Sequence, residues 1–135
     1  MTVRSARHTF RKSERLCSRK ILAALATTGK SIHQHPLKLM WLGTELTREV
    51  PAQIAFAVPK KNFRRAADRN LIKRRMREAY RKNKNALYPL IRQAGQSVAL
   101  LMIYTGKAPA EYTETESKTQ LILSKLAEEI KKAAG

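Results

Sequence analysis

The chain has 135 residues, of which 43% are hydrophobic, so it is long and apolar enough for one domain with a buried core. Its 28 Lys and Arg residues outnumber 10 Asp and Glu residues, and the formal net charge is +18. Such a charge is typical of proteins that bind nucleic acid or an anionic membrane. No apolar run approaches the ~20 residues of a membrane span, and the N-terminus lacks the apolar core of a signal peptide. We therefore expect no membrane partner.

The N-terminal residues 1–12 are polar and basic, without a regular hydrophobic period. We expect a mobile basic arm here, with Phe10 as a candidate anchor, in front of a single α/β domain over residues 13–135. A disordered tail and an RNA-contacting arm fit this stretch equally well.

A first helix is predicted from about Glu14 to Thr28, because apolar residues recur at helical spacing between a candidate N-cap, Ser13, and a C-terminal Gly29. The single cysteine, Cys17, falls on the apolar side of this helix. It permits no internal disulfide, which is typical of a reducing compartment. We expect a cytoplasmic protein in which Cys17 packs rather than reacts.

Three strands are predicted next. Residues 30–35 form a short strand and residues 36–42 a stronger one, while the polar residues 43–51 are expected to form a hairpin loop. Residues 53–58 alternate between larger apolar side chains and alanines. The small side chains leave room for a packed helix or for a ligand, and packing is favoured.

The second basic stretch, residues 60–84, holds 12 Lys or Arg residues and two acids, which is +10 of the total charge. Its charges follow a helical period from Arg69 to Lys84, with the helix starting at Asp68 or Ala67. The apolar face of this helix consists of Ile72, Met76 and Ala79, with Tyr80 at its edge. The basic stripe beside it consists of Arg69, Lys73, Arg77 and Arg81, widened by Asn70, Arg74 and Lys84. Such a helix can dock by its apolar side and present its basic side to a polyanion.

The C-terminal third of the chain predicts a short helix, a strand and a last helix. Residues 87–92 predict a short helix, and the almost continuously apolar residues 97–104 predict an inner strand covered on both faces. Thr113 and Glu116 have the spacing of a capping box at the start of a last helix. The apolar face of that helix is formed by Ile122, Leu123, Leu126, Ile130 and Ala133.

These elements predict an α/β fold of the α+β sandwich type, in the order α-β-β-β-α-β-α. We expect a small mixed sheet of about four strands, packed with helices in two layers, with the basic helix crossing between neighbouring strands.

The sequence shows none of the usual signs of protein catalysis. Clustered carboxylates, a glycine-rich phosphate loop and a serine nucleophile motif are all missing. His33 and His35 would share one face of an extended strand, as a metal pair or an acid–base pair would, but no third ligand lies nearby. A surface pair or RNA contacts are favoured. We therefore expect no catalytic residue, no metal site and no small-molecule substrate.

A basic helix could read the major groove of DNA, but the two-helix DNA-binding motif needs a second helix joined by a tight turn. Here a strand and a basic loop precede the helix, which favours recognition of folded RNA by shape and backbone.

The string Lys60-Lys61, a short basic loop and then Arg69-Asn70-Leu71-Ile72-Lys73-Arg74-Arg75-Met76-Arg77-Glu78 resembles the signature of the bacterial ribonuclease P protein component. That family carries RN, two residues, KR, two residues and R, after a strand that ends in paired lysines. The spacing matches throughout residues 57–80, and the element order matches from about residue 7 to residue 132.

The resemblance implies a subunit of an endoribonuclease that removes the 5′ leader of precursor tRNA by hydrolysing one phosphodiester bond. It implies that a catalytic RNA subunit binds the magnesium ions, that catalysis belongs to that RNA, and that the fold has a left-handed β-α-β crossover, against the usual right-handed rule. The RNA-facing set it implies is Lys60, Lys61, Arg69, Asn70, Lys73, Arg74 and Arg77. We add Arg64, Arg65 and Arg81 of the same basic stretch as candidate RNA-binding residues. Arg75 and Lys82 lie elsewhere on the helix and are expected to be solvent charges. Asn70 has two roles open to it, fixing the loop or contacting RNA.

The resemblance also implies a cleft for the leader, formed by the sheet and the first helix. Its candidate residues are Arg15, Leu16, Arg19, His35 and Phe56. Family members often line this cleft with aromatic rings, whereas the comparable positions here are Leu16, Leu25, Ile32 and His35. With His35 as the one flat ring, we expect the leader to be held by shape and charge rather than by base stacking.

Two other functions remain open. One is a ribosomal or ribosome-assembly RNA-binding protein without an enzymatic role, and the other is a protein nuclease that acts alone.

Overall fold

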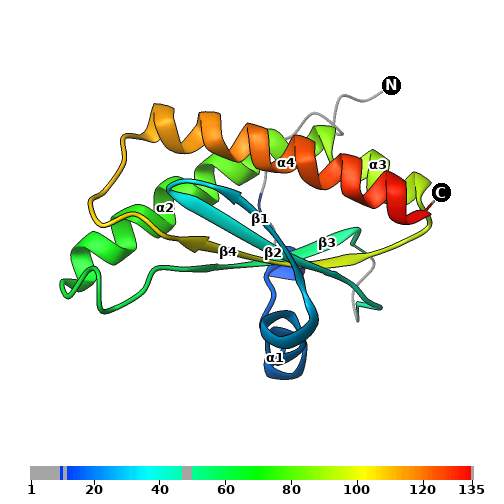
Figure 1. The fold of residues 1–135 in the computed structure, drawn as a ribbon, viewed down its shortest axis with the longest axis horizontal. Coiled ribbons are helices and arrows are strands. Elements are labelled where there is room, and N and C mark those ends of the chain that lie inside the picture. The colour runs from blue at the N-terminus through cyan, green and yellow to red at the C-terminus, as the bar shows by residue number, and fades with distance from the viewer. Residues whose placement is uncertain (1–9, 11, 47–49, 135) are drawn as a thin grey trace.

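The computed structural model describes residue 10, residues 12–46 and residues 50–134. The elements run in the order η2 (Lys12–Glu14), α1 (Arg19–Thr28), β1 (Lys30–Gln34), β2 (Leu37–Gly43), β3 (Ala52–Ala57), α2 (Ala66–Asn83), η3 (Lys84–Ala86), α3 (Tyr88–Gln93), β4 (Val98–Tyr104) and α4 (Tyr112–Ala134). Helices α2, α3 and α4 cover one face of the sheet and α1 lies on the other (Figure 1). The predicted α+β class is confirmed, and α1 adds a third layer to the two expected.

The sheet has the strand order β1-β2-β4-β3. Strands β1 and β2 form an antiparallel hairpin whose turn contains a cis peptide bond between His35 and Pro36. Strand β2 pairs antiparallel with β4, and β4 pairs in parallel with β3. The sheet is therefore mixed, as predicted. Residues 43–51 are not a hairpin loop, however, because β4 lies between the two strands that this loop joins.

Strand β4 is the inner strand that its apolar sequence predicts. Val98, Ala99 and Leu100 are each 0% exposed, since the strand is covered from both faces of the sheet. Helix α2 connects β3 to β4, which are parallel neighbours, and so crosses between adjacent strands. This connection places the basic helix directly over the sheet.

The first helix is shorter than predicted. It begins at Arg19, because the hydroxyl of Ser18 accepts a hydrogen bond from the backbone N–H of Ile21 at 3.2 Å and so forms the N-cap. Residues 15–18 are not helical, and Leu16 donates its backbone N–H to the carbonyl of Ile54 on β3 at 3.0 Å. Cys17 is consequently exposed, and the expectation that it packs in a helix is wrong.

The C-terminal boundary of α1 is confirmed at Gly29, which donates its N–H to the carbonyl of Leu25. A Cβ atom at position 29 would lie 2.5 Å from that carbonyl oxygen. The close approach explains the need for glycine here.

The apolar residues divide between the two faces of the sheet. The larger core lies between the sheet and helices α2, α3 and α4, and contains Ile54, Ile72, Met76 and Leu100. A smaller core lies under α1 and centres on Leu16, Leu25 and Ala99. Because Ala55 packs against this smaller core, the small side chains of β3 make room for packing, as favoured from the sequence.

Helix α4 begins at Tyr112, before Thr113, so the predicted capping box is not formed. Ile122, Leu123, Leu126 and Ile130 are buried as predicted, while Ala133 is exposed in the last turn. Among the helices of the described residues, none is both long and apolar enough to span a bilayer.

Candidate nucleic-acid interface

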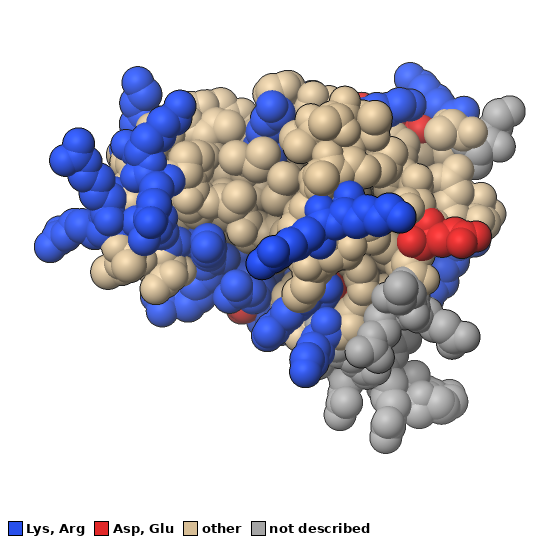
Figure 2. Space-filling view, turned by 90° about the horizontal axis from the view of Figure 1, so that it is seen from below, with Lys and Arg blue, Asp and Glu red and all other residues tan. Residues whose placement is uncertain are grey.

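Helix α2 has the two faces that its sequence predicts. Ile72, Met76, Ala79 and Tyr80 are buried against the core. Asn70, Arg74 and Arg77 are exposed on the other side. Seen from the α1 side, Lys and Arg side chains gather toward the end of the molecule where α2 begins (Figure 2). The helix therefore presents a positive surface over an apolar contact.

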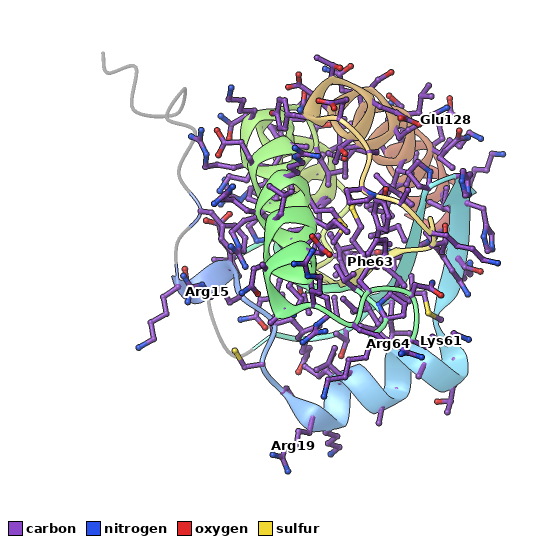
Figure 3. The ribbon with its side chains drawn as sticks, turned by 90° about the vertical axis from the view of Figure 1, so that its left-hand side faces the viewer. Arg15, Arg19, Lys61, Phe63, Arg64 and Glu128 are labelled. Carbon is purple, nitrogen blue, oxygen red and sulfur yellow. The ribbon has the colours of Figure 1, made fainter. Side chains whose placement is uncertain are left out.

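The loop before α2 extends this surface. Its four basic residues Lys60, Lys61, Arg64 and Arg65 are all exposed, and Figure 3 shows Lys61 and Arg64 on the end of the molecule that faces the viewer. Phe63 anchors the loop, because its ring is 6% exposed and packs edge-on against Tyr104, with the ring centroids 5.8 Å apart.

Arg69 also holds this loop. Its Nη1 donates to the carbonyl of Phe63 at 2.7 Å and to the carbonyl of Arg64 at 2.9 Å. Two roles were open for Asn70: fixing the loop or contacting RNA. The neighbouring Arg69 fixes the loop, and Asn70 is exposed. The loop charges are presented in a defined arrangement rather than on a free chain.

Besides Arg69, other basic residues in and just after α2 have protein partners, and Lys82 lies 3.9 Å from a carboxylate oxygen of Glu78. Arg81 forms an ion pair with Glu78, with two hydrogen bonds at 2.9 and 2.6 Å, which lowers the pKa of Glu78 and raises that of Arg81. Lys84 is 4% exposed and is ion-paired with Glu14, so it does not widen the basic stripe as expected. Arg75 is more than a solvent charge, because it donates to the carbonyl of Ala110 ahead of α4.

A groove of about 320 Å³ runs between α2, β3 and the segment that precedes α1. It is lined by Phe10, Arg15, Leu16, Cys17, Ile54, Ala55, Phe56, Lys73 and Arg77. The guanidinium carbon of Arg77 lies 5.9 Å from the centroid of the Phe56 ring. The groove thus combines aromatic and aliphatic walls with cations from two different elements.

The structure brings together three of the five residues predicted to bind the leader: Arg15, Leu16 and Phe56. Arg19 is exposed on the first turn of α1, where Figure 3 shows it pointing away from the molecule. His35 is exposed in the β1–β2 turn and does not line the groove.

Among the four positions compared with the family's aromatic residues, His35 alone carries a ring, and it does not line the groove. Phe10 and Phe56 both line the groove, and their centroids are 6.2 Å apart in an edge-on contact. Leu25 is buried under α1, and Ile32 lies in the core on the opposite face of the sheet. The sequence predicts Phe10 as an anchor, and the structure places it in the groove beside the non-helical residues Arg15, Leu16 and Cys17.

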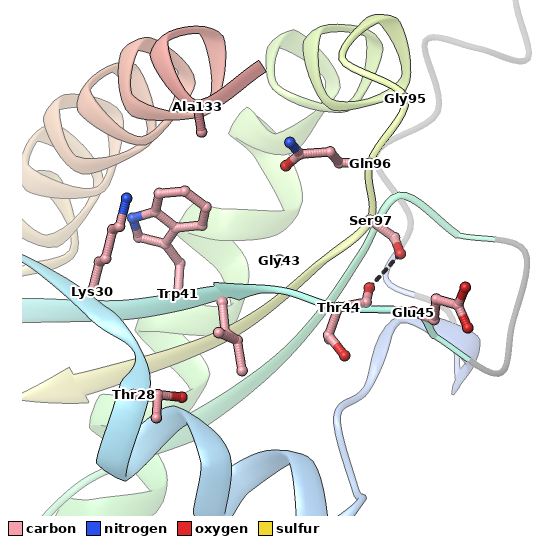
Figure 4. Close-up of a pocket in the computed structure, with 11 residues that line it drawn as sticks. Thr28, Lys30, Trp41, Gly43, Thr44, Glu45, Gly95, Gln96, Ser97 and Ala133 are labelled. Atoms are coloured by element: carbon pink, nitrogen blue, oxygen red, sulfur yellow. Dashed lines mark hydrogen bonds between the residues drawn. The ribbon is translucent and has the colours of Figure 1, made fainter. Parts of the chain in front are cut away.

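A larger cavity of about 500 Å³ lies at the other end of the sheet, between the end of β2, the start of β4 and the last turn of α4 (Figure 4). Its walls include Trp41, Gln96 and Ser97. The Nε1–H of Trp41 is already donated to Glu129 at 2.8 Å. This cavity shares no lining residue with the basic groove.

Metal-ligating side chains do not cluster in the part of the chain that the structure describes, where no three His, Cys, Asp or Glu residues are placed to hold an ion. His33 and His35 are both exposed. The chemistry that the described surface offers is the neutralisation of phosphates and the stacking of flat groups.

Sequence comparison with known proteins identifies one family. The model of the Ribonuclease P family matches residues 10–127. The chain is 37% identical over 107 residues to the ribonuclease P protein component of Chlorobium phaeobacteroides, covering 73% of each protein. It is 38% identical over 95 residues to that of Porphyromonas gingivalis, covering 68% of this chain and 69% of that protein.

Solved structures show the same fold at low sequence identity. The ribonuclease P protein of Staphylococcus aureus superimposes with a TM-score of 0.67 at 16% identity, covering 85% of this chain and 96% of that one. The ribonuclease P protein of Thermotoga maritima gives a TM-score of 0.67 at 20% identity, covering 83% and 96%. With a family match over most of the described residues and relatives above 30% identity, the chain belongs to the ribonuclease P protein component family.

Proposed function

We propose that this protein is the subunit of ribonuclease P that binds the catalytic RNA and the 5′ leader of precursor tRNA, and so supports removal of the leader. The observation that carries the proposal is the groove, which places Lys73 and Arg77 of the basic helix opposite Arg15 and Phe56. One helix can therefore contact two RNA segments at once.

The basic residues divide between these two tasks. The outer side of α2 and the loop before it bind the catalytic RNA, because their charges are exposed and the loop is held by Arg69. This set is Lys60, Lys61, Arg64, Arg65, Asn70 and Arg74. Arg81 contributes less, because Glu78 already neutralises its charge.

The groove binds the leader. Arg15, Lys73 and Arg77 face its phosphates, and Phe56 and Phe10 supply flat apolar surface for a sugar or a base. Arg19, at the start of α1, is placed to meet phosphates further along the leader.

The reaction is hydrolysis of one phosphodiester bond, with magnesium ions bound by the RNA subunit. This chain contributes by holding the leader beside the catalytic RNA, which fixes the orientation of the scissile bond relative to the reacting groups. Its positive field also offsets the repulsion between two polyanions.

Precursor tRNA incubated with the protein, with the catalytic RNA and with both at moderate magnesium tests this function. We expect efficient removal of the leader when both are present. Cleavage by the protein alone would identify a protein nuclease. No stimulation of the RNA, together with co-sedimentation of the protein with ribosomes, would identify a ribosomal or assembly protein.

A further inference from the structure

A buried ion pair joins the segment before α1 to the end of α2. Glu14 and Lys84 are each 4% exposed, although 70 residues separate them in the sequence. The same carboxylate oxygen of Glu14 accepts a hydrogen bond from the hydroxyl of Tyr88 at 2.6 Å. Tyr88 is in turn 2.9 Å from the hydroxyl of Tyr80. Glu14 and Lys84 are thus buried, whereas the RNA-facing charges Arg74 and Arg77 are exposed.

The segment that Glu14 belongs to is a wall of the groove. On one side it is held to β3, where the Gln53 side chain donates to the carbonyl of Ser13 at 2.9 Å and Leu16 donates to the carbonyl of Ile54 at 3.0 Å. On the other side Glu14 reaches Lys84. The next two residues, Arg15 and Leu16, line the groove.

Lys84 also contacts the other end of this segment. Its ammonium lies 5.8 Å from the centroid of the Phe10 ring, and that ring packs edge-on against Phe56 and Tyr80. One buried cation therefore touches both the aromatic residue that enters the groove and the carboxylate that precedes Arg15.

Stability alone does not account for a pair of this kind. Two buried charges are costly to desolvate, and replacing both with apolar side chains of similar size is often neutral or stabilising. Unlike apolar side chains, a buried ion pair is satisfied in only one arrangement. The carboxylate of Glu14 must contact the ammonium of Lys84 and the hydroxyl of Tyr88 at the same time.

We propose that the Glu14–Lys84 ion pair is a positioning device for the leader groove. It sets the place of Phe10 and of residues 12–16 relative to α2, and so fixes Arg15, Leu16 and Phe10 opposite Lys73 and Arg77. The inference rests on the proposed function, since the groove must bind the leader for this placement to matter. Neither Glu14 nor Lys84 lines the groove, so both act through the residues that they hold.

The test is the double variant Glu14→Met/Lys84→Met, assembled with the catalytic RNA. Because the double variant lacks both charges, it contains no unpaired buried ion from this pair. We therefore expect the double variant to fold with a melting temperature close to that of the unaltered protein. Holoenzyme affinity is then measured for precursor tRNA with its leader and for the same RNA without a leader. We expect the affinity gained from the leader to fall about tenfold. Affinity for the leaderless RNA and for the catalytic RNA should stay within about twofold.

A milder pair of variants addresses the case in which the double variant does not fold. Tyr88→Phe removes one hydrogen bond from Glu14 and leaves the ion pair, whereas Tyr80→Phe removes a hydroxyl that does not touch Glu14. We expect Tyr88→Phe to weaken leader binding about threefold and Tyr80→Phe to weaken it less. The exposed Glu128→Gln on α4 serves as a control for the loss of one acid.

The outcomes test the positioning role of the ion pair and the leader site separately. A folded double variant, or a Tyr88→Phe variant, that binds the leader as well as the unaltered protein overturns the positioning role. If the unaltered holoenzyme itself gains no affinity from the leader, the proposed leader site fails and the positioning role fails with it. A selective loss of leader affinity at unchanged melting temperature supports both.

Discussion

The guanidinium carbon of Arg77 lies 5.9 Å from the centroid of the Phe56 ring, and both residues line the leader groove. The pair offers a cation and a flat apolar surface at one place. We expect a leader whose nucleotides lack bases to bind the holoenzyme more weakly by about 1–3 kcal/mol for each base that stacks there. Phe56→Leu should remove most of that difference.

The control for Phe56→Leu is Tyr112→Leu, which alters a partly exposed aromatic residue that does not line the groove. This control should leave the penalty for missing bases unchanged. Equal binding of normal and base-free leaders by the unaltered holoenzyme would show that charge and shape alone hold the leader. Titration of each leader into the holoenzyme gives the comparison.

Two substitutions on α2 separate folding from RNA binding. Ile72 is 2% exposed, so Ile72→Ala should lower the free energy of unfolding by about 2–4 kcal/mol. Lys73 lines the groove, and Lys73→Ala should change stability by less than about 0.5 kcal/mol while weakening RNA binding. Chemical denaturation of the isolated protein measures the difference. Equal losses for these two variants would mean that the faces of α2 are assigned wrongly.

Arg69 is expected to behave differently from Lys73, because it donates to the carbonyls of Phe63 and Arg64. Arg69→Ala should cost about 1–2 kcal/mol of stability, as expected for losing two such bonds, and should also weaken binding of the catalytic RNA. Arg69→Lys keeps the charge but not the planar fork, so it should restore binding only in part. Full recovery by lysine would show that charge alone matters at this position.

Binding of the catalytic RNA should depend steeply on salt. If about six phosphates are neutralised, the logarithm of the affinity should fall with the logarithm of the salt concentration with a slope near −4 to −5. Arg74→Ala should reduce the magnitude of this slope by about one. Arg81→Ala should reduce it less, because Arg81 is already paired with Glu78. A slope near zero for the unaltered protein would contradict an electrostatic interface.

Alkaline pH should unfold the protein as its tyrosines ionise. Burial raises the pKa of Tyr80 and Tyr88 above the ordinary value of 10.0 in the folded state. The resulting stability is therefore fully present below pH 10 and is lost as pH rises above it, because the unfolded chain releases these protons first. Tyrosinate absorbance from these two residues should appear together with loss of circular dichroism. Ionisation of Tyr88 in a still-folded protein would contradict its burial, and Tyr88→Phe identifies its share of the signal.

The sequence predicts regular elements well where one strong pattern governs them. The period of Ile72, Met76 and Ala79 fixes the buried side of α2, and the apolar run of residues 98–104 fixes the central strand. The exposure of the loop before α2 follows from its charged residues Lys60, Lys61, Arg64 and Arg65. These features depend on local order along the chain, which hydrophobic periodicity reports directly.

The groove could not be predicted in the same way, because it depends on contacts between distant residues. Leu16 and Cys17 continue a helical pattern, yet Leu16 pairs with Ile54 and the helix begins only after Ser18. Lys84 continues the basic stripe of α2, yet it is buried against Glu14. In both cases a contact with a residue far away in the sequence determines the structure, against the local helical pattern. A single sequence does not reveal such a contact. Both departures shape the groove.

The position of β4 has a consequence for how the chain acquires its structure. Strands β2 and β3 follow one another in the sequence, but each pairs with β4, which is synthesised only after α2 and α3. Until residues 98–104 have left the ribosome, the two halves of the sheet have no common strand, and the basic helix has no completed surface to dock on. Pairing over such sequence distances is slow compared with local helix formation. The basic helix α2 is therefore synthesised before the strand that completes the sheet on which it packs.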